Sequence, residues 1–147
     1  MHLCTFESRE KTRMNQRHAD QLVASFRYFE PCGAALIAKV FRNLSDKHPN
    51  VRALFPEETG HLNKRFFDTL GQVVSNIQRF HALQGPLGEL GRRAEREGAN
   101  AGHYRIIRSE LIEVMAELAA DDWTEELDCL WRQTLDAVSG AMLAGVT

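Results

Sequence analysis

The chain has 147 residues, of which 44% are hydrophobic, and this suits one domain that buries its own core without help from disulfides or metals. Its formal net charge of -2 provides no overall positive field, so we expect neither nucleic acid nor an anionic membrane surface as a partner. No stretch of the sequence approaches the ~18–20 apolar residues that a membrane span requires.

The N-terminal residues 1–18 are predicted to form a flexible leader, followed by one domain over residues 19–147. The leader mixes acidic and basic side chains and lacks the apolar run of a secretory signal. Three widely spaced cysteines, Cys4, Cys32 and Cys129, form no CxxC pair, which favours reduced thiols over a disulfide framework. We therefore expect a cytoplasmic protein.

Hydrophobic periodicity predicts helices along the whole domain. Leu22, Phe26 and Phe29 indicate a first helix that ends near Pro31. The apolar positions between Leu36 and Leu44 indicate a second helix, which should end before Pro49. No alternating run of β-branched residues indicates a strand.

Three later helices have the clearest patterns of apolar residues. They are marked by Leu62, Phe66, Phe67, Leu70, Val73, Val74 and Ile77; by Leu111, Val114, Met115 and Leu118; and by Leu127, Leu130, Trp131, Leu135, Val138 and Met142. The acidic, hydroxyl-containing residues 121–125 precede the last of them and suit a helix N-terminus. The glycine-rich residues 98–102 are expected to join two helices.

Local sequence selects one packing among the possible helical folds. Residues 40–56, VFRNLSDKHPNVRALFP, resemble the second and third helices of single-domain bacterial haemoglobins, with a pattern close to F-Y-x-N-L-x-x-x-x-P-x-V-R-x-L-F. Residues 70–77 resemble the distal helix of that family, and residues 90–104 resemble its proximal stretch. The resemblance implies an all-α, globin-like fold with six to eight helices in a three-over-three arrangement.

The same resemblance implies the positions of a former haem pocket. Phe55 matches the phenylalanine that packs on the porphyrin, and Tyr104 matches the tyrosine that supports the proximal histidine. Ala94 stands where the family carries that histidine, and Val146 where it carries the acid paired with the tyrosine. The distal tyrosine and glutamine positions and the residue one turn beyond them are occupied by Phe41, Leu62 and Phe66.

A methyl group donates nothing to iron, and these distal side chains cannot hydrogen-bond a bound gas, so we expect no cofactor, with haem as the alternative. A haem-free globin must fill the vacated space or bind another molecule. Phe41, Phe66 and Phe67 are candidate fillers, and ordinary core is preferred here to a specialised apolar pocket.

The sequence gives little support for a metal site or for catalysis. His61, His81 and His103 are interpreted as surface histidines, and no histidine pair has the i, i+4 spacing of a zinc site, so no metal is expected. The carboxylates of residues 121–126 are explained by helix capping, and no nucleophile has an arguable base partner, so we expect no enzyme. The mixed charges of residues 92–97 suit a solvated face or a docking surface.

Globin-like domains without the proximal histidine are known as sensory or regulatory modules, some of which accept fatty acids. Because the chain stops at Thr147 without an output domain, the resemblance implies a haem-free regulatory protein that acts through contacts with another protein. The alternatives are a haem protein with unorthodox ligation and a binder of a fatty acid or other apolar ligand.

The C-terminal helix suggests a homodimer. Its small residues would allow a second helix to approach, and Val138, Met142 and Leu143 would supply apolar contact beside them.

Overall fold

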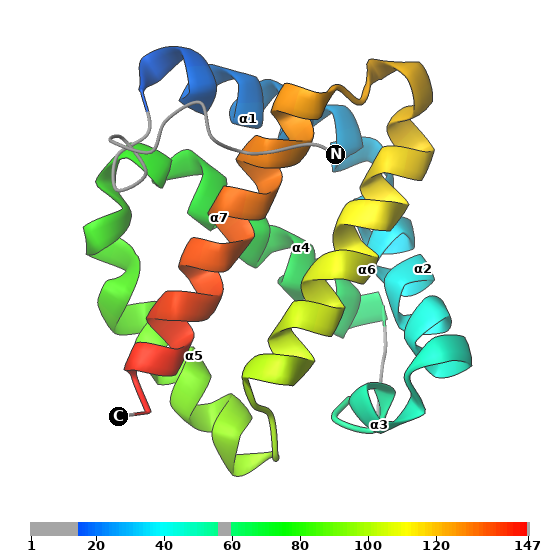
Figure 1. The fold of residues 1–147 in the computed structure, drawn as a ribbon, viewed down its shortest axis with the longest axis vertical. Coiled ribbons are helices and arrows are strands. Elements are labelled where there is room, and N and C mark those ends of the chain that lie inside the picture. Colours follow the sequence, from blue (N-terminus) through cyan, green and yellow to red (C-terminus); the bar gives the residue numbers. More distant parts are fainter. Residues whose placement is uncertain (1–14, 56–59, 147) are drawn as a thin grey trace.

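The computed structural model describes residues 15–55 and 60–146 (Figure 1). Every regular element in these two ranges is helical, which confirms the expected all-α fold class. The α-helices are α1 (Gln16–Phe29), α2 (Gly33–Lys47), α3 (Pro49–Arg52), α4 (Gly60–Ser75), α5 (Gln84–Arg96), α6 (Ala101–Ala119) and α7 (Glu125–Ala144). Short 3-10 turns η2 (Glu30–Cys32), η3 (Ile77–Leu83) and η4 (Ala120–Asp122) connect some of them.

Two layers of helices enclose the core. Helices α1 and α4, continued through η3 into α5, form one layer, and α2, α6 and α7 form the other. The main contacts between the layers are those of α5 with α7 and of α2 with α4, and Figure 1 shows α7 crossing in front of α4. The largest fully buried side chains are Trp131, Phe29 and Phe41. The Trp131 indole Nε1 donates to the Ser25 hydroxyl at 3.0 Å, which ties α7 to α1 inside this core.

Helix boundaries follow the turn and capping residues of the sequence. The breaks before Pro31 and Pro49 lie where the sequence predicted them, and the Thr124 hydroxyl accepts from the Leu127 N–H at the start of α7. Helix α1 begins at Gln16, so the expected leader boundary at residue 19 falls inside a helix. The remainder of that leader, residues 1–14, lies outside the described residues.

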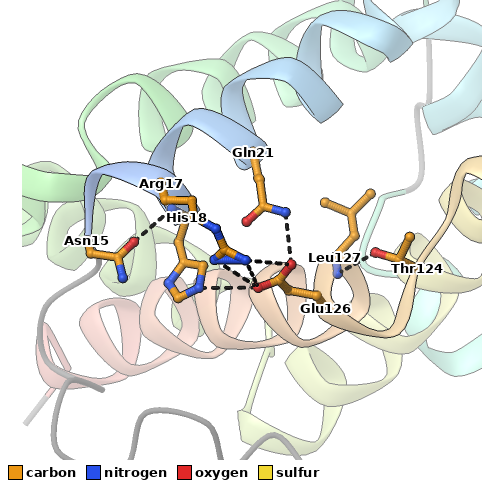
Figure 2. A network of polar contacts seen from close by, with 7 residues as sticks. All are labelled: Asn15, Arg17, His18, Gln21, Thr124, Glu126 and Leu127. Atoms are coloured by element: carbon orange, nitrogen blue, oxygen red, sulfur yellow. Dashed lines mark hydrogen bonds and ion pairs between the residues drawn. The ribbon is translucent and has the colours of Figure 1, made fainter.

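A polar network joins the N-terminal helix to the start of α7 (Figure 2). The Glu126 carboxylate accepts from the Gln21 amide at 3.0 Å and from the Arg17 guanidinium at 3.1 Å. The Nε2 of His18, a buried residue, lies 3.4 Å from the same carboxylate. The hydrogen bond from Gln21, with the nearby charge of Arg17, lowers the pKa of Glu126, so this carboxylate stays ionised.

Helices α5 and α7 cross at glycine residues, so that their backbones come into close contact. A Cβ added to Gly91 would lie 2.6 Å from the carbonyl carbon of Met142 and 2.8 Å from its Cα. Gly88 and Gly145 face each other in the same crossing, where a Cβ on Gly88 would lie 3.3 Å from the Cα of Gly145. Gly145 and the Met142 backbone near the end of α7 therefore lie against α5 of the same chain, whereas Gly140 and Ala144 are exposed, and the dimer seam expected along this helix stays a prediction.

The structure bears on two expectations, that the cysteines are reduced and that no segment crosses a membrane. Cys129 is disulfide-bonded, so the expectation of reduced thiols is wrong for this residue. The cysteines therefore no longer support the expected cytoplasmic location. Cys32 is a free, exposed thiol, and Cys4 lies outside the described residues. No helix in the described part of the chain combines the length and the apolar character needed to cross a membrane.

Candidate functional site

A cavity of about 710 Å³ lies between α4, α5, α6 and α7. This volume falls within the range of ~300–1,000 Å³ that small-molecule sites occupy. Its lining residues are Leu54, Phe55, Leu62, Arg65, Phe66, Thr69, Leu70, Val73, Leu87, Leu90, Arg93, Ala94, Arg96, Glu97, Ala99, Tyr104, Ile107, Arg108, Leu111, Leu135, Val138, Ser139 and Met142.

The burial of the lining residues distinguishes the floor of the cavity from its mouth. Five lining side chains are buried and form an apolar floor: Leu70, Val73, Leu87, Leu111 and Leu135. Among the described lining residues, the exposed ones belong to α4, to α5 or to the residue that follows α5, namely Arg65, Thr69, Leu90, Arg93, Arg96 and Glu97. A residue that both lines a cavity and faces solvent stands at its opening, so the mouth lies between α4 and α5.

The structure brings together five of the six residues that the resemblance assigned to the former haem pocket. Phe55, Leu62, Phe66, Ala94 and Tyr104 all line the cavity. Phe41 does not, and this placement is corrected: it is only 2% exposed and packs in the core behind the cavity, with its ring 5.0 Å from that of Phe55.

The aromatic side chains leave the cavity open. Of the candidate fillers, Phe66 lines the wall, with its ring 6.2 Å from that of Phe41. Phe67 points into the core, where it stacks on Phe26 at 4.5 Å. The interpretation as ordinary core is therefore correct for Phe41 and Phe67, while Phe66 is a wall residue of an open cavity.

Two of the three expected dimer contacts also belong to this wall. Val138 and Met142 line the cavity, and Leu143 is half-buried near the C-terminal end of α7. Both side chains are half-buried, and their assignment to an interface between two chains stays a prediction. The homodimer itself stays a prediction.

Four arginines on the cavity lining were not singled out by the sequence as site residues. Arg65 on α4 and Arg93 and Arg96 on α5 stand at the mouth, whereas Arg108 on α6 donates to Asp136 on α7. Their helical spacing was a usable signal, because Arg65 follows the pocket position 62 by three residues and Arg108 follows position 104 by four.

Tyr104 contributes a phenol to the cavity lining, to which Ala94 also belongs. Burial, together with the neighbouring charge of Glu95, raises the pKa of this phenol above its usual range. Tyr104 therefore presents a neutral hydroxyl to the cavity, which can donate or accept a hydrogen bond.

The donor set of the cavity does not fit a histidine-ligated haem. Among the described residues that line the cavity, none is a histidine or a cysteine, and position 94 offers only a methyl group. His61 and His81 are exposed, and the His103 Nδ1 accepts from the Asn100 backbone N–H in a capping box at the start of α6. His103 thus has a structural role that the sequence interpretation as a surface histidine missed.

The family comparison agrees with this architecture. The family model described as Globin matches residues 38–142. The flavohemoprotein of Vibrio cholerae serotype O1 is 21% identical over 121 residues, which cover 80% of this chain and 31% of that protein. The chain thus spans about a third of the length of this relative. A crystal structure of the closed form of HGbRL's globin domain is 26% identical, covers 90% of this chain and 96% of that chain, and has a TM-score of 0.43.

Proposed function

Because the chain belongs to the globin family, we propose that it is a haem-free regulatory globin domain, which binds an apolar small molecule in its cavity and acts through contacts with another protein. One observation carries the proposal: the cavity is open, its floor is hydrocarbon, and no described residue of its lining supplies an imidazole or a thiolate. Such a site favours apolar ligands through burial of their surface, at ~25 cal/mol per Å².

A hemin titration followed in the Soret region tests the haem-free part of this proposal. The unmodified protein should give no stoichiometric spectrum of histidine-ligated haem. Ala94→His should give one, because position 94 lies on the wall of a cavity that the aromatics leave open. A sharp histidine-ligated spectrum from the unmodified protein would contradict the proposal, and a failure of Ala94→His to bind hemin would show that the cavity does not accept haem.

Haem with unorthodox ligation is the second candidate, favoured by the open cavity and by a relative named flavohemoprotein. Tyr104 and Met142 are the lining residues with oxygen or sulfur donors that have precedent as axial ligands. A raised pKa keeps the Tyr104 phenol protonated, which disfavours the phenolate that iron would require. Hemin titrations of Tyr104→Phe and Met142→Leu distinguish the two: a spectrum lost in one variant alone identifies that residue as the ligand.

The regulatory part of the proposal requires a protein partner and no catalysis. Among the described residues, no group of three or more His, Cys, Asp or Glu side chains is placed to hold a metal ion. For a second copy of the chain as partner, size exclusion coupled to light scattering should show a dimer at micromolar concentrations. A monomer there would remove self-association and leave a different protein as the partner.

A further inference from the structure

We propose that the cavity mouth is a docking site for an acidic segment of a partner protein, which places an apolar side chain in the opening between α4 and α5. This inference rests on the proposed function and names the chemistry of its protein partner. It begins from an uneven distribution of charge. The whole chain has a formal net charge of -2, whereas the described charged residues exposed at the mouth are three arginines and one glutamate, namely Arg65, Arg93, Arg96 and Glu97.

The mouth opens between two helices that do not pack closely against each other. Helix α4 packs mainly on α2 and α1, helix α5 packs mainly on α7, and η3 connects the two. Leu90 is 36% exposed on the α5 side of the mouth and belongs to the same lining as the half-buried Leu62 and Phe66, so the apolar surface of the cavity reaches the outside here. An apolar groove between two helices is a surface that partner peptides commonly use.

The mouth arginines select an acidic partner. Arg65, Arg93 and Arg96 form no ion pair with any residue in the ranges 15–55 and 60–146, whereas their neighbour Arg92 is paired with Glu89. They stand on both sides of the opening, Arg65 on α4 and the other two on α5. A guanidinium binds a carboxylate through paired N–H donors, so an acidic segment along the mouth would be held from both helices, and a basic segment would be repelled.

The cavity supplies the site for an apolar anchor of the partner. Its floor is formed by buried aliphatic side chains, among them Leu70, Leu111 and Leu135. Full burial of a leucine or phenylalanine anchor contributes about ten- to hundredfold in affinity, whereas each exposed ion pair at the mouth contributes about two- to fivefold. The anchor therefore provides most of the affinity, and the arginines provide the preference for acidic partners. A small apolar molecule in the cavity takes the space of the anchor, so it should release the partner.

Calorimetric titration of the full chain with three synthetic peptides tests the class of partner. Each peptide has about 15 residues, enough to form a helix on binding. The acidic peptide combines glutamate and alanine with leucines spaced three and four residues apart. The basic peptide has lysine in place of glutamate, and the third is the acidic peptide with alanine in place of leucine. The acidic peptide should bind most tightly, with the other two about tenfold weaker, and its advantage over the basic peptide should shrink in 1 M salt, where the Debye length is about 3 Å.

Matched charge variants then locate the acidic segment. Arg65→Gln combined with Arg93→Gln should weaken the acidic peptide about tenfold, which is about threefold for each exposed ion pair. The control is Arg42→Gln combined with Arg105→Gln, which removes the same charge from exposed positions on α2 and α6 that do not line the cavity, and it should leave the preference for the acidic peptide intact. Leu90→Ser removes apolar surface instead of charge, so it should weaken the acidic peptide and leave the salt dependence of its binding unchanged.

Competition with dodecanol, a neutral apolar molecule, tests whether the anchor enters the cavity. If the leucine of the peptide and dodecanol occupy the same space, dodecanol at ten times its Kd should raise the apparent Kd of the acidic peptide about elevenfold. Displacement of the neutral dye Nile red measures the binding of dodecanol itself. An unchanged affinity for the peptide in saturating dodecanol would show that the peptide binds elsewhere, and it would overturn the inference.

The outcomes separate the inference from the proposed function. If dodecanol binds but the acidic peptide does not, or if both double variants lose affinity equally, the docking site is wrong while the apolar-ligand site stands. If the acidic peptide binds with the expected preference but neither Nile red nor dodecanol binds, the docking site stands and the small-molecule part of the proposed function fails. If nothing binds, both fail. A dimer in solution that dissociates in the variant of Arg65 and Arg93 would identify a second copy of the chain as the occupant and overturn the separate partner.

Discussion

The close crossing of α5 and α7 makes Gly91→Ala the most informative test of the fold around the cavity. The substitution has two opposing effects. Alanine is favoured over glycine in a helix by about 0.8–1.0 kcal/mol. Against this, the new Cβ would lie 2.6 Å from the Met142 carbonyl carbon, and overpacking of this kind costs about 1–3 kcal/mol. The atoms that the new Cβ meets belong to the backbone, which cannot rotate away as a side chain would. The destabilisation from overpacking should therefore lie near the upper end of this range.

The net expectation for Gly91→Ala is a loss of about 1–2 kcal/mol in the free energy of unfolding, or a melting temperature about 2–8 °C lower for a chain of this size. Gly140→Ala is the matched control, because a Cβ there meets nothing within 4 Å and only the helix propensity changes. It should stabilise the protein by about 0.5–1 kcal/mol. Urea unfolding followed by helical circular dichroism measures both variants, and equal stabilisation would refute the close crossing.

Three further substitutions test the contacts between α1 and α7 and the cap of α7. Because the pKa of Glu126 is lowered in the folded state, its stabilising effect is present above its ordinary value of 4.5 and is lost as the pH falls through the folded pKa. The urea midpoint should therefore fall less steeply between pH 5 and pH 3 in Glu126→Gln than in the unmodified protein, and parallel profiles would refute this. Trp131→Phe removes the buried hydrogen bond to Ser25 and should cost about 1–3 kcal/mol in urea unfolding, whereas an unchanged midpoint would show that the bond contributes nothing. Thr124→Ala removes the N-cap of α7 and should cost about 1 kcal/mol, which Thr124→Ser should recover.

The sequence predicted the helices well because the physics that forms them is local. Apolar spacing identified most of the buried faces of α4, α6 and α7, although Leu118, expected on the apolar face of α6, is exposed. Proline or capping residues marked where several helices begin and end. The family pattern in residues 40–56 then selected the packing. The wider resemblance, which includes residues 70–77 and 90–104, also predicted much of the cavity wall, since five of the six expected positions lie there.

Whether the cavity is filled could not be predicted, because it depends on the rotation and spacing of packed helices. Phe66 and Phe67 are neighbours in the sequence, yet their side chains leave α4 in directions about 100° apart, so one lines the cavity and the other enters the core. Phe41 could equally have pointed inward. The spacing of apolar residues in the sequence cannot distinguish a side chain that lines a cavity from one that fills it.

The C-terminal helix shows a second limit of sequence reasoning. A run of small residues shows that another backbone comes near, but it does not say whether that backbone belongs to the same chain. Here the glycines of α5 lie opposite the end of α7, so two glycine-containing surfaces meet within one molecule. The complementary glycines at positions 88 and 91 were present in the sequence, and pairing the two runs would have been the signal.

Ligand binding and the α5–α7 crossing should be coupled, because Met142 and Val138 belong to the cavity wall and Met142 also lies against Gly91. A ligand that binds only the folded state at 100 times its Kd adds about 2.7 kcal/mol to the free energy of unfolding. Because Gly140 does not line the cavity, a saturating apolar ligand such as dodecanol should raise the melting temperature of the unmodified protein and of Gly140→Ala by the same amount. In Gly91→Ala the added Cβ displaces the backbone that carries Met142, and the increase should be smaller. An equal increase in all three proteins would show that the crossing supports the fold without shaping the cavity.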